Sequence, residues 1–288
     1  MSPAVRRVLV TAGVVILLLV LVGATYQGVA TALERRRFPH PGRMVDVGGH
    51  QLHLYCQGQG TPTVVLEAPA TTLSAVWKWV QTDVARATRV CSYDRAGLGW
   101  SEAGDTAFTP QAVAPELNAL LAKAGEQPPL VMAGAELGAA LATLYAARYP
   151  DDTAALVLVN PPGAFSQNRA SSPSPKFVAF SPWLARTGIL RAMRPLSAGT
   201  GELPQPAAGM LRAFLNRPDH LTRAGGELAR WDDAVMLSEA ATLRRGMPVT
   251  QLEVEGRDRV ALLANRRNAQ DVAQAIDRAV QASRRGRR

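Results

Sequence analysis

The stretch PLVMAGAELGAALATLYAARYPDDTAALVLVN, residues 129–160, decides the fold class. It begins with a short apolar run, turns at Gly134–Gly138, continues as a helical stretch to Tyr149, and ends in an uncharged run at Ala155–Asn160. Short apolar runs bounded by turn residues are typical of strands buried on both faces. A strand, a helix and a second strand in this order predict a parallel α/β sheet with helices on both faces.

The alternation of strands and helices begins well before this stretch. Gln51–Cys56 alternates between apolar and polar residues, Thr63–Ala68 is a short apolar run, and Arg89–Tyr93 reads as a third strand. Helical stretches at Trp77–Ala87 and Pro110–Ala124 separate the later strands. The chain before residue 129 therefore predicts further strands and helices of the same sheet.

The composition changes after Pro161. Residues 163–246 are rich in proline, serine and glycine and contain only helical stretches, which predicts a helical cap over the sheet. A strand at Met247–Glu255 and a helix at Ala269–Ser283 complete the predicted fold. Val260–Ala264 fits either a short strand or a helical turn, because a short apolar run does not distinguish the two.

The N-terminal segment is apolar enough to cross a membrane. Val8–Leu33 contains no charged residue, and such a run spans a hydrocarbon core of about 30 Å. Ala30-Thr31-Ala32 offers a signal-peptide cleavage site, but the apolar run exceeds the roughly 7–15 residues of a signal-peptide core. We predict a retained single-pass anchor at residues 1–33, in contact with the lipid bilayer through residues 8–33. A linker at 34–48 and a domain at 49–288 follow.

Positive charge is concentrated at the two ends of the chain. Of 32 Lys and Arg residues, nine lie in three arginine clusters, and the remaining 23 balance the 23 acidic residues. The neutral body argues against nucleic acid as a partner, because nucleic-acid-binding proteins present a basic face. Arg6-Arg7 and Arg35–Arg37 flank the anchor almost equally and leave its orientation open. The basic tail at 284–288 is predicted to be a solvated end.

Few residues are suited to metal binding. The two cysteines exclude a disulfide-rich scaffold and a cysteine-rich zinc module. His50 and His53 lie three apart on one predicted strand and point to opposite faces, and His220 is predicted at the surface or at a helix start in the cap. No phosphate-binding glycine loop opens a helix. We therefore predict neither a metal site nor a cofactor.

Several motifs, in order along the chain, resemble the α/β-hydrolase fold family, in particular its bacterial members with an N-terminal membrane segment. The resemblance covers roughly residues 42–288 and implies a mostly parallel sheet with a helical cap. Its motifs are VDVGGHQLHLYCQGQGTPTVVLEA at 45–68, RVCSYDRAGLGWSE at 89–102 and LYAARYPDDTAALVLVN at 144–160. In the second motif, the residues that shape the turn beside the family's active site are Asp94, Arg95, Gly97, Gly99 and Ser101.

The resemblance implies a nucleophile, usually serine, at the centre of a Gly-x-Ser-x-Gly turn. Here the turn reads GAELG at 134–138, so that both glycines are kept and Glu136 stands at the nucleophile position. Related dehalogenases use an aspartate there to form an ester, which a histidine-activated water then releases. The alternative is that Glu136 only interacts with the positive end of the following helix, worth about 0.3–1 kcal/mol. We favour this second interpretation.

The resemblance also implies a catalytic histidine after the last strand, and this chain has no histidine after His220. The matching stretch is Gly256-Arg257-Asp258-Arg259 or the residues around Leu262, and arginine cannot act as a general base because it stays protonated. Asp258 lies about where the family places its acid. Without a histidine to orient, we interpret it as a solvated loop carboxylate. The family's serine and histidine are thus predicted to be lost.

Two further expectations follow from the resemblance. The N–H groups of Ala70 and Leu137 are candidates for an oxyanion site, although Pro69 provides no N–H in a loop that is often glycine-rich in the family. Cys56 and Cys91 fall on strands that are neighbours in this fold, which leaves both a disulfide and two buried free thiols open. A disulfide would favour an extracytoplasmic body.

We predict from these observations a single-pass protein of the cell membrane that is a catalytically inactive pseudo-hydrolase. It would bind a membrane-protein partner or a small ligand, for example as an accessory subunit of a membrane complex. The alternative is an active hydrolase of small ester-like substrates that uses Glu136. A third hypothesis is a structural protein whose cap meets a membrane neighbour.

Overall fold

The part of the chain that this computed structural model describes comprises residues 2–163, 175–193, 195–256 and 258–285. Its strands are β1 (Arg43–Asp46), β2 (Gln51–Gln57), β3 (Thr63–Glu67), β4 (Val90–Tyr93), β5 (Leu130–Ala135), β6 (Thr153–Val159) and β7 (Val249–Leu252). They form a seven-stranded sheet in the order β1-β2-β4-β3-β5-β6-β7. The pairs β1–β2 and β2–β4 are antiparallel, and all other neighbours are parallel.

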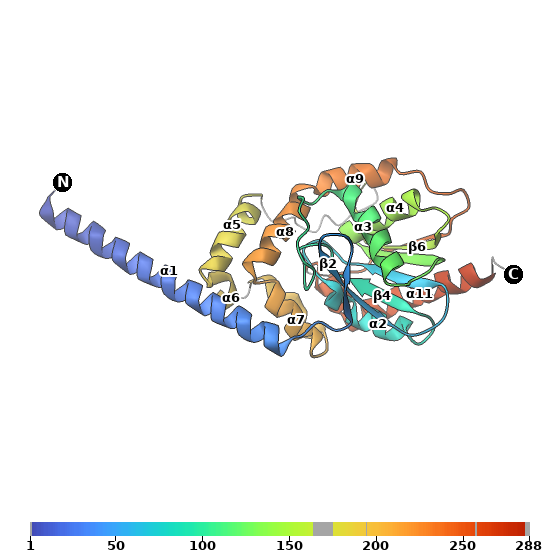
Figure 1. Cartoon of the computed structure of the whole chain (residues 1–288), viewed down its shortest axis with the longest axis horizontal. Helices are drawn as coiled ribbons and strands as arrows, with labels where there is room; N and C mark the ends of the chain where they lie inside the picture. Colours follow the sequence, from blue (N-terminus) through green and yellow to red (C-terminus); the bar gives the residue numbers. More distant parts are fainter. Residues whose placement is uncertain (1, 164–174, 194, 257, 286–288) are drawn as a thin grey trace.

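Helices cover both faces of this sheet (Figure 1). Side chains of β3 alternate between the faces: Val64 and Leu66 pack on the side of α2 and α11, and Val65 packs on the side of α3 and α4. The predicted mostly parallel α/β fold is therefore confirmed. The elements outside the cap are η1 (Ser74–Trp77), α2 (Lys78–Val84), α3 (Pro110–Lys123), α4 (Leu137–Arg148), α10 (Ala261–Ala264) and α11 (Arg266–Arg285).

In the described part of residues 163–246 the regular elements are all helices, joined by turns and irregular segments. Residues 164–174 and 194 lie outside the described part of the chain. Helix α9 packs on α4, whereas α5 to α8 lie between the sheet and the N-terminal helix (Figure 1). The cap elements are α5 (Pro175–Arg186), α6 (Ile189–Met193), η2 (Pro195–Glu202), α7 (Ala207–Phe214), α8 (Pro218–Ala229) and α9 (Trp231–Ala240).

The prediction of a linker at residues 34–48 is wrong, because the end of a helix and a β-strand lie within this range. The N-terminal helix continues to Arg37, and β1 pairs with β2 from Arg43 to Asp46. Gly48 and Gly49 form the turn of this hairpin, with φ values of 109° and 111°. The Asp46 carboxylate accepts the Gly48 N–H at 2.7 Å. The glycine pair is therefore a hairpin turn, a conformation that favours glycine.

The C-terminal region differs from its predictions at two points. The open alternatives at Val260–Ala264 resolve to the helical turn α10, whose Ala261 N–H is accepted by Asp258 Oδ1 at 2.8 Å. The prediction that the basic tail is a solvated end is wrong for Arg284. Its side chain donates to the carbonyls of Thr61 at 2.9 Å and Ala87 at 3.1 Å. Residues 286–288 of that predicted tail lie outside the described part.

Helix α1 (Pro3–Arg37) extends away from the body as a single rod (Figure 1). It contains an 18-residue window of mean hydropathy 2.8 and is long and apolar enough to cross a membrane, a test that a signal sequence also meets. From Gly23 onward one face of α1 packs on the cap, since a Cβ at Gly23 would lie 2.0 Å from the Thr187 carbonyl oxygen. Helix α1 is thus joined to the cap by packed contacts rather than by a loose chain.

A polar cluster makes this joint. Gln27 is buried, and its side-chain amide donates to the Asn216 carbonyl at 3.1 Å. Arg191 of α6 donates to Gln27 Oε1 at 2.7 Å and forms an ion pair with Glu34. Because the Arg191 side chain is only 7% exposed, its charge depends on these partners from α1 for compensation.

Cys56 of β2 and Cys91 of β4 stand opposite one another in the sheet and form a disulfide. They also lie with Glu126 in a group spaced closely enough to hold a metal ion. Bonded cysteine sulfurs are no longer available as thiolate ligands, so the group does not act as a metal site in this form.

We expect replacement of both cysteines, Cys56→Ala together with Cys91→Ala, to lower the free energy of unfolding by about 3–4 kcal/mol, because the bond closes a loop of 35 residues in the unfolded chain. Chemical denaturation of the full chain in mild detergent, with and without a reducing agent, measures the loss. The reducing agent should weaken the wild type and leave the double variant unchanged. An equal effect on both proteins would contradict the prediction.

Candidate functional site

The turn between β5 and α4 has a geometry that its two glycines require. A Cβ at Gly134 would lie 2.2 Å from the Gly138 carbonyl oxygen, and a Cβ at Gly138 would lie 2.3 Å from the Glu67 carbonyl oxygen. Between them Glu136 adopts φ 50° and ψ −118°. A non-glycine residue with such a backbone is strained by about 1–3 kcal/mol, a cost typical of functional turns. The sharp strand-to-helix turn predicted from the sequence is therefore formed.

Glu136 is buried and forms an ion pair with Arg259. Glu136 Oε2 accepts from Arg259 Nε at 2.8 Å, and the two side chains are 5% and 11% exposed. Burial raises the pKa of Glu136 above its ordinary value, although Arg259 opposes that shift. The sequence placed Arg259 in one of the two stretches that could match the family's histidine, the other lying around Leu262, but did not predict that Arg259 would contact Glu136. Opposite charge at the two positions was the signal that could have indicated the pair.

Apolar side chains surround this turn on the cap side. Ala70 and Leu137, the two candidate oxyanion residues, are fully buried and belong to one cluster with Phe108, Ala234 and Trp231. The guanidinium of Arg259 lies over the Trp231 ring, 5.3 Å from its centroid. The structure thus brings Ala70 and Leu137 together beneath cap residues, in an environment of packed side chains.

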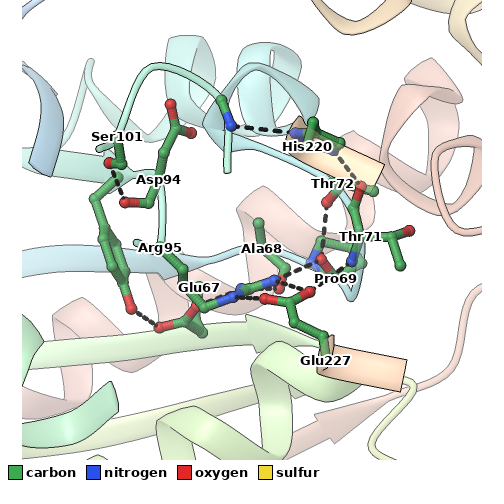
Figure 2. Close-up of polar contacts among 12 residues, drawn as sticks. Glu67, Ala68, Pro69, Thr71, Thr72, Asp94, Arg95, Ser101, His220 and Glu227 are labelled. Atoms are coloured by element: carbon green, nitrogen blue, oxygen red, sulfur yellow. Dashed lines mark hydrogen bonds and ion pairs between the residues drawn. The ribbon is translucent and has the colours of Figure 1, made fainter. Parts of the chain in front are cut away.

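A second charged cluster lies where the cap meets the carboxyl end of the sheet (Figure 2). Arg95 forms ion pairs with Glu67 of β3 at 2.7 Å and with Glu227 of α8 at 2.5 Å, and all three side chains are at most 3% exposed. Arg95 also donates to the carbonyls of Ala68 and Pro69. One guanidinium therefore holds the sheet, the loop after β3 and the cap together. Sequence reasoning identified Arg95 only as a turn residue and missed both carboxylates.

His220 is buried at the start of α8, and its predicted position at a helix start is correct while a surface position is wrong. Its Nδ1 accepts the Gly99 N–H at 3.2 Å, which leaves Nε2 to donate to the Thr71 carbonyl at 2.9 Å (Figure 2). Burial lowers the pKa of His220 below its ordinary value. Both ring nitrogens of a neutral imidazole are thus engaged, and neither is available as a proton acceptor.

The histidines of β2 and its turn are engaged elsewhere. The His53 ring contacts Asp94 Oδ2 at 3.0 Å and the Pro41 carbonyl, and His50 contacts Glu116 Oε1 at 3.0 Å. The Ser101 hydroxyl lies nearby but donates to the backbone carbonyl of Asp94 rather than to an imidazole. This arrangement of serine, histidine and aspartate therefore lacks the serine–histidine contact that activates a nucleophile.

In the described structure Asp258 makes no hydrogen bond or ion pair with Glu136. It is exposed, and its carboxylate accepts the N–H that begins α10. The position that resembles the family's acid therefore performs a capping role.

The cavity under the cap lies apart from the nucleophile turn. It has a volume of about 800 Å³ and opens between the end of α1, the loop after β4 and helices α7 and α8. Phe38, Trp100, Phe214 and Arg223 are among its lining residues, whereas Glu136 is not. The motif at 89–102 indicated one wall, since its Gly97, Gly99 and Ser101 line the cavity. The other walls come from residues 34–40 and 213–226, which no motif in the sequence brought together with it.

Comparisons with known proteins agree with this architecture. Residues 65–186 match the family described as alpha/beta hydrolase fold. The uncharacterized protein YqjL of Bacillus subtilis (strain 168) is 31% identical over 105 residues, 36% of this chain and 42% of that protein. The chain thus spans less than half the length of this relative.

Solved structures show the same fold at low sequence identity. An enol-lactonase from Burkholderia xenovorans LB400 is similar with a TM-score of 0.61 and 18% identity, over 83% of this chain and 100% of the other. A bacterial membrane phospholipase A is similar with a TM-score of 0.59 and 18% identity, over 99% of each chain. At these identities the likeness establishes the fold.

We expect Arg259→Met to lower the free energy of unfolding at pH 8 by about 3 kcal/mol, because it leaves Glu136 buried without its counter-charge. The raised pKa of Glu136 sets the sign of the pH dependence: the penalty is small where the carboxyl is protonated and grows as pH rises through that pKa. The loss should therefore be smaller at pH 5, as measured by denaturation at both values.

The matched control is Glu136→Gln combined with Arg259→Met, which removes both charges and should regain most of the stability at pH 8. A single variant that is equally weakened at both pH values, with no recovery in the double variant, would show that the pair is not coupled in this way.

Proposed function

We propose, from the premise that this chain is an α/β-hydrolase-fold protein, that it is a membrane-anchored pseudo-hydrolase that acts by binding. The observation that carries this proposal is the buried ion pair of Glu136 with Arg259, 2.8 Å apart. Glu136 stands at the family's nucleophile position, and Arg259 lies in one of the two stretches that could match the family's histidine base. An arginine stays protonated at working pH and cannot take up a proton from a nucleophile or a water.

The other route to catalysis at this turn is a carboxylate nucleophile, and the surroundings of Glu136 argue against it. An attack by Glu136 would require a nucleophilic carboxylate, whereas the ion pair of Oε2 with Arg259 stabilises the negative charge and so weakens the carboxylate as a nucleophile. The resulting ester would need a base to activate water. His220, the cap histidine, uses both ring nitrogens in hydrogen bonds to backbone groups.

The joint between α1 and the cap supports a retained anchor. Cleavage after Ala32 would remove Gln27, whose side chain is buried and bound to Arg191. Arg191 would then keep only part of its partners in a site that is 7% exposed, which is unfavourable for a charge. A signal sequence has no reason to contribute to the packing of the mature domain.

Exposed apolar side chains near the anchor support a membrane or membrane-protein neighbour for the cap. Phe180 and Trp183 of α5 are 66% and 67% exposed, and Met193 of α6 is 74% exposed. Helix α5 packs beside α1, so these side chains lie near the anchor. The Cys56–Cys91 disulfide supports an extracytoplasmic body, since such bonds persist in oxidising compartments.

We expect the full chain in mild detergent to show no turnover of short-chain esters and no labelling by a serine-directed fluorophosphonate. Glu136→Ala should leave these results unchanged, with Glu253→Ala, which removes an exposed carboxylate, as the matched control. Turnover that disappears in Glu136→Ala but persists in Glu253→Ala would overturn the proposal and identify a hydrolase of small esters.

The accessory-subunit role has a separate test. Affinity purification of the chain from its native membrane in mild detergent, followed by mass spectrometry, should recover a stoichiometric membrane protein. Recovery of this chain alone would contradict that role, and would leave small-ligand binding as the function of the fold.

A further inference from the structure

The cavity of about 800 Å³ under the cap has the size and the wall of a small-molecule site. Binding pockets of roughly 300–1,000 Å³ with aromatic walls and a few polar groups are typical of ligand sites. Four aromatic side chains line this one, and the rings of Trp100 and Phe214 meet edge to face with centroids 4.8 Å apart. The aromatic lining residues are Phe38, Trp100, Phe108 and Phe214.

Arg223 is the unusual polar group of this wall. Its stem packs against Gly97, where a Cβ would lie 3.0 Å from Arg223 Cγ, and its guanidinium lies 5.7 Å from the centroid of the Phe108 ring. One terminal nitrogen donates to the Thr106 carbonyl at 3.1 Å, while the buried Nε has no hydrogen-bond partner in the described structure. Burial lowers the pKa of Arg223 below its ordinary value. The carboxylates of Glu227 and Glu116 offset this shift only in part and neither forms an ion pair with Arg223 in the described structure, so the guanidinium can still gain from a directly bound anion.

The other charges of the cavity leave room for one anionic group. Asp219 is paired with Arg217, and Glu34 is paired with Arg191 outside the cavity. Glu102, the third acid of the lining, accepts the Gln51 N–H at 2.8 Å. None of the three acids forms an ion pair with Arg223 in the part of the chain that the structure describes. A guanidinium is a suitable partner for a carboxylate, because it offers several N–H donors in a fixed planar arrangement.

We propose that this cavity binds a single-chain amphiphile with a carboxylate head, of the fatty-acid type, with the head on Arg223 and the chain along the aromatic wall. The proposal deepens the proposed binding function, on which it rests, by naming the ligand class. Glu34, Arg35 and Phe38 at the end of α1 belong to the lining. An anchor that spans the bilayer would therefore place this cavity close to the membrane surface, where such amphiphiles partition.

The test uses the full chain in nanodiscs of neutral phosphatidylcholine and radiolabelled decanoate, with empty nanodiscs as the blank. We expect saturable binding near one decanoate per chain, and at least tenfold weaker binding of decanol, which has the same chain and no charge. Arg223→Gln should weaken decanoate binding at least tenfold. Arg230→Gln is the matched control, because Arg230 is 57% exposed, follows the same helix and does not line the cavity.

A second variant guards against misfolding of Arg223→Gln. Ala107 is exposed and lines the cavity, so Ala107→Trp should fill the space and weaken decanoate binding while Arg223 and the core remain intact. Decanoate binding that is unchanged in both variants, or equal binding of decanol, would overturn the proposal.

The ester and fluorophosphonate assays separate this inference from the proposed function. Absence of turnover together with absence of saturable decanoate binding would overturn the ligand assignment and leave the pseudo-hydrolase proposal standing. Turnover that depends on Glu136, together with decanoate binding that depends on Arg223, would overturn the pseudo-hydrolase proposal and support the ligand site.

Discussion

The buried guanidinium of Arg95 forms ion pairs with two carboxylates that belong to different layers of the fold. Glu67 belongs to the sheet and Glu227 to the cap, so each partner is buried only as long as the layers stay together. A buried pair contributes little net stability by itself, but loss of one partner is costly because the remaining charge is unpaired. The cap is therefore held in one position by an interaction that penalises any opening. The positions of α8 and of the loop after β3 depend on this constraint.

A similar constraint joins the cap to helix α1 through Arg191. Its partners Gln27 and Glu34 lie seven residues apart on α1, two turns of helix, and thus share one face. The sheet, the cap and helix α1 are in this way connected in series by two buried arginines. Such a chain of contacts favours a rigid arrangement of the three parts, because neither joint separates without leaving an uncompensated charge in a poorly hydrated environment.

The sequence predicted the layers of this fold well and its long-range polar contacts poorly. The apolar runs at β3 and β5 are local signals, and the pattern of hydrophobic residues is sufficient to predict strands there. Glu67 and Glu227 are 160 residues apart in the sequence, and no local pattern indicates that both reach Arg95. The Gly48-Gly49 pair shows a related limit: its composition resembles a linker, and only strand pairing makes it a hairpin. At the nucleophile turn the residue identities were readable, whereas the partner of Glu136 depended on the folded geometry.

The pairing of Glu136 with Arg259 also restricts which substitutions the turn tolerates. The strained backbone is formed around Glu136, and its side chain is buried against Arg259. A serine at position 136 alone would leave Arg259 buried beside a neutral group, and a histidine at position 259 alone would leave the acid without its strong counter-charge. Either single change is therefore costly unless the other accompanies it. The two positions form an epistatic pair, and a change of chemistry at this turn requires both substitutions together.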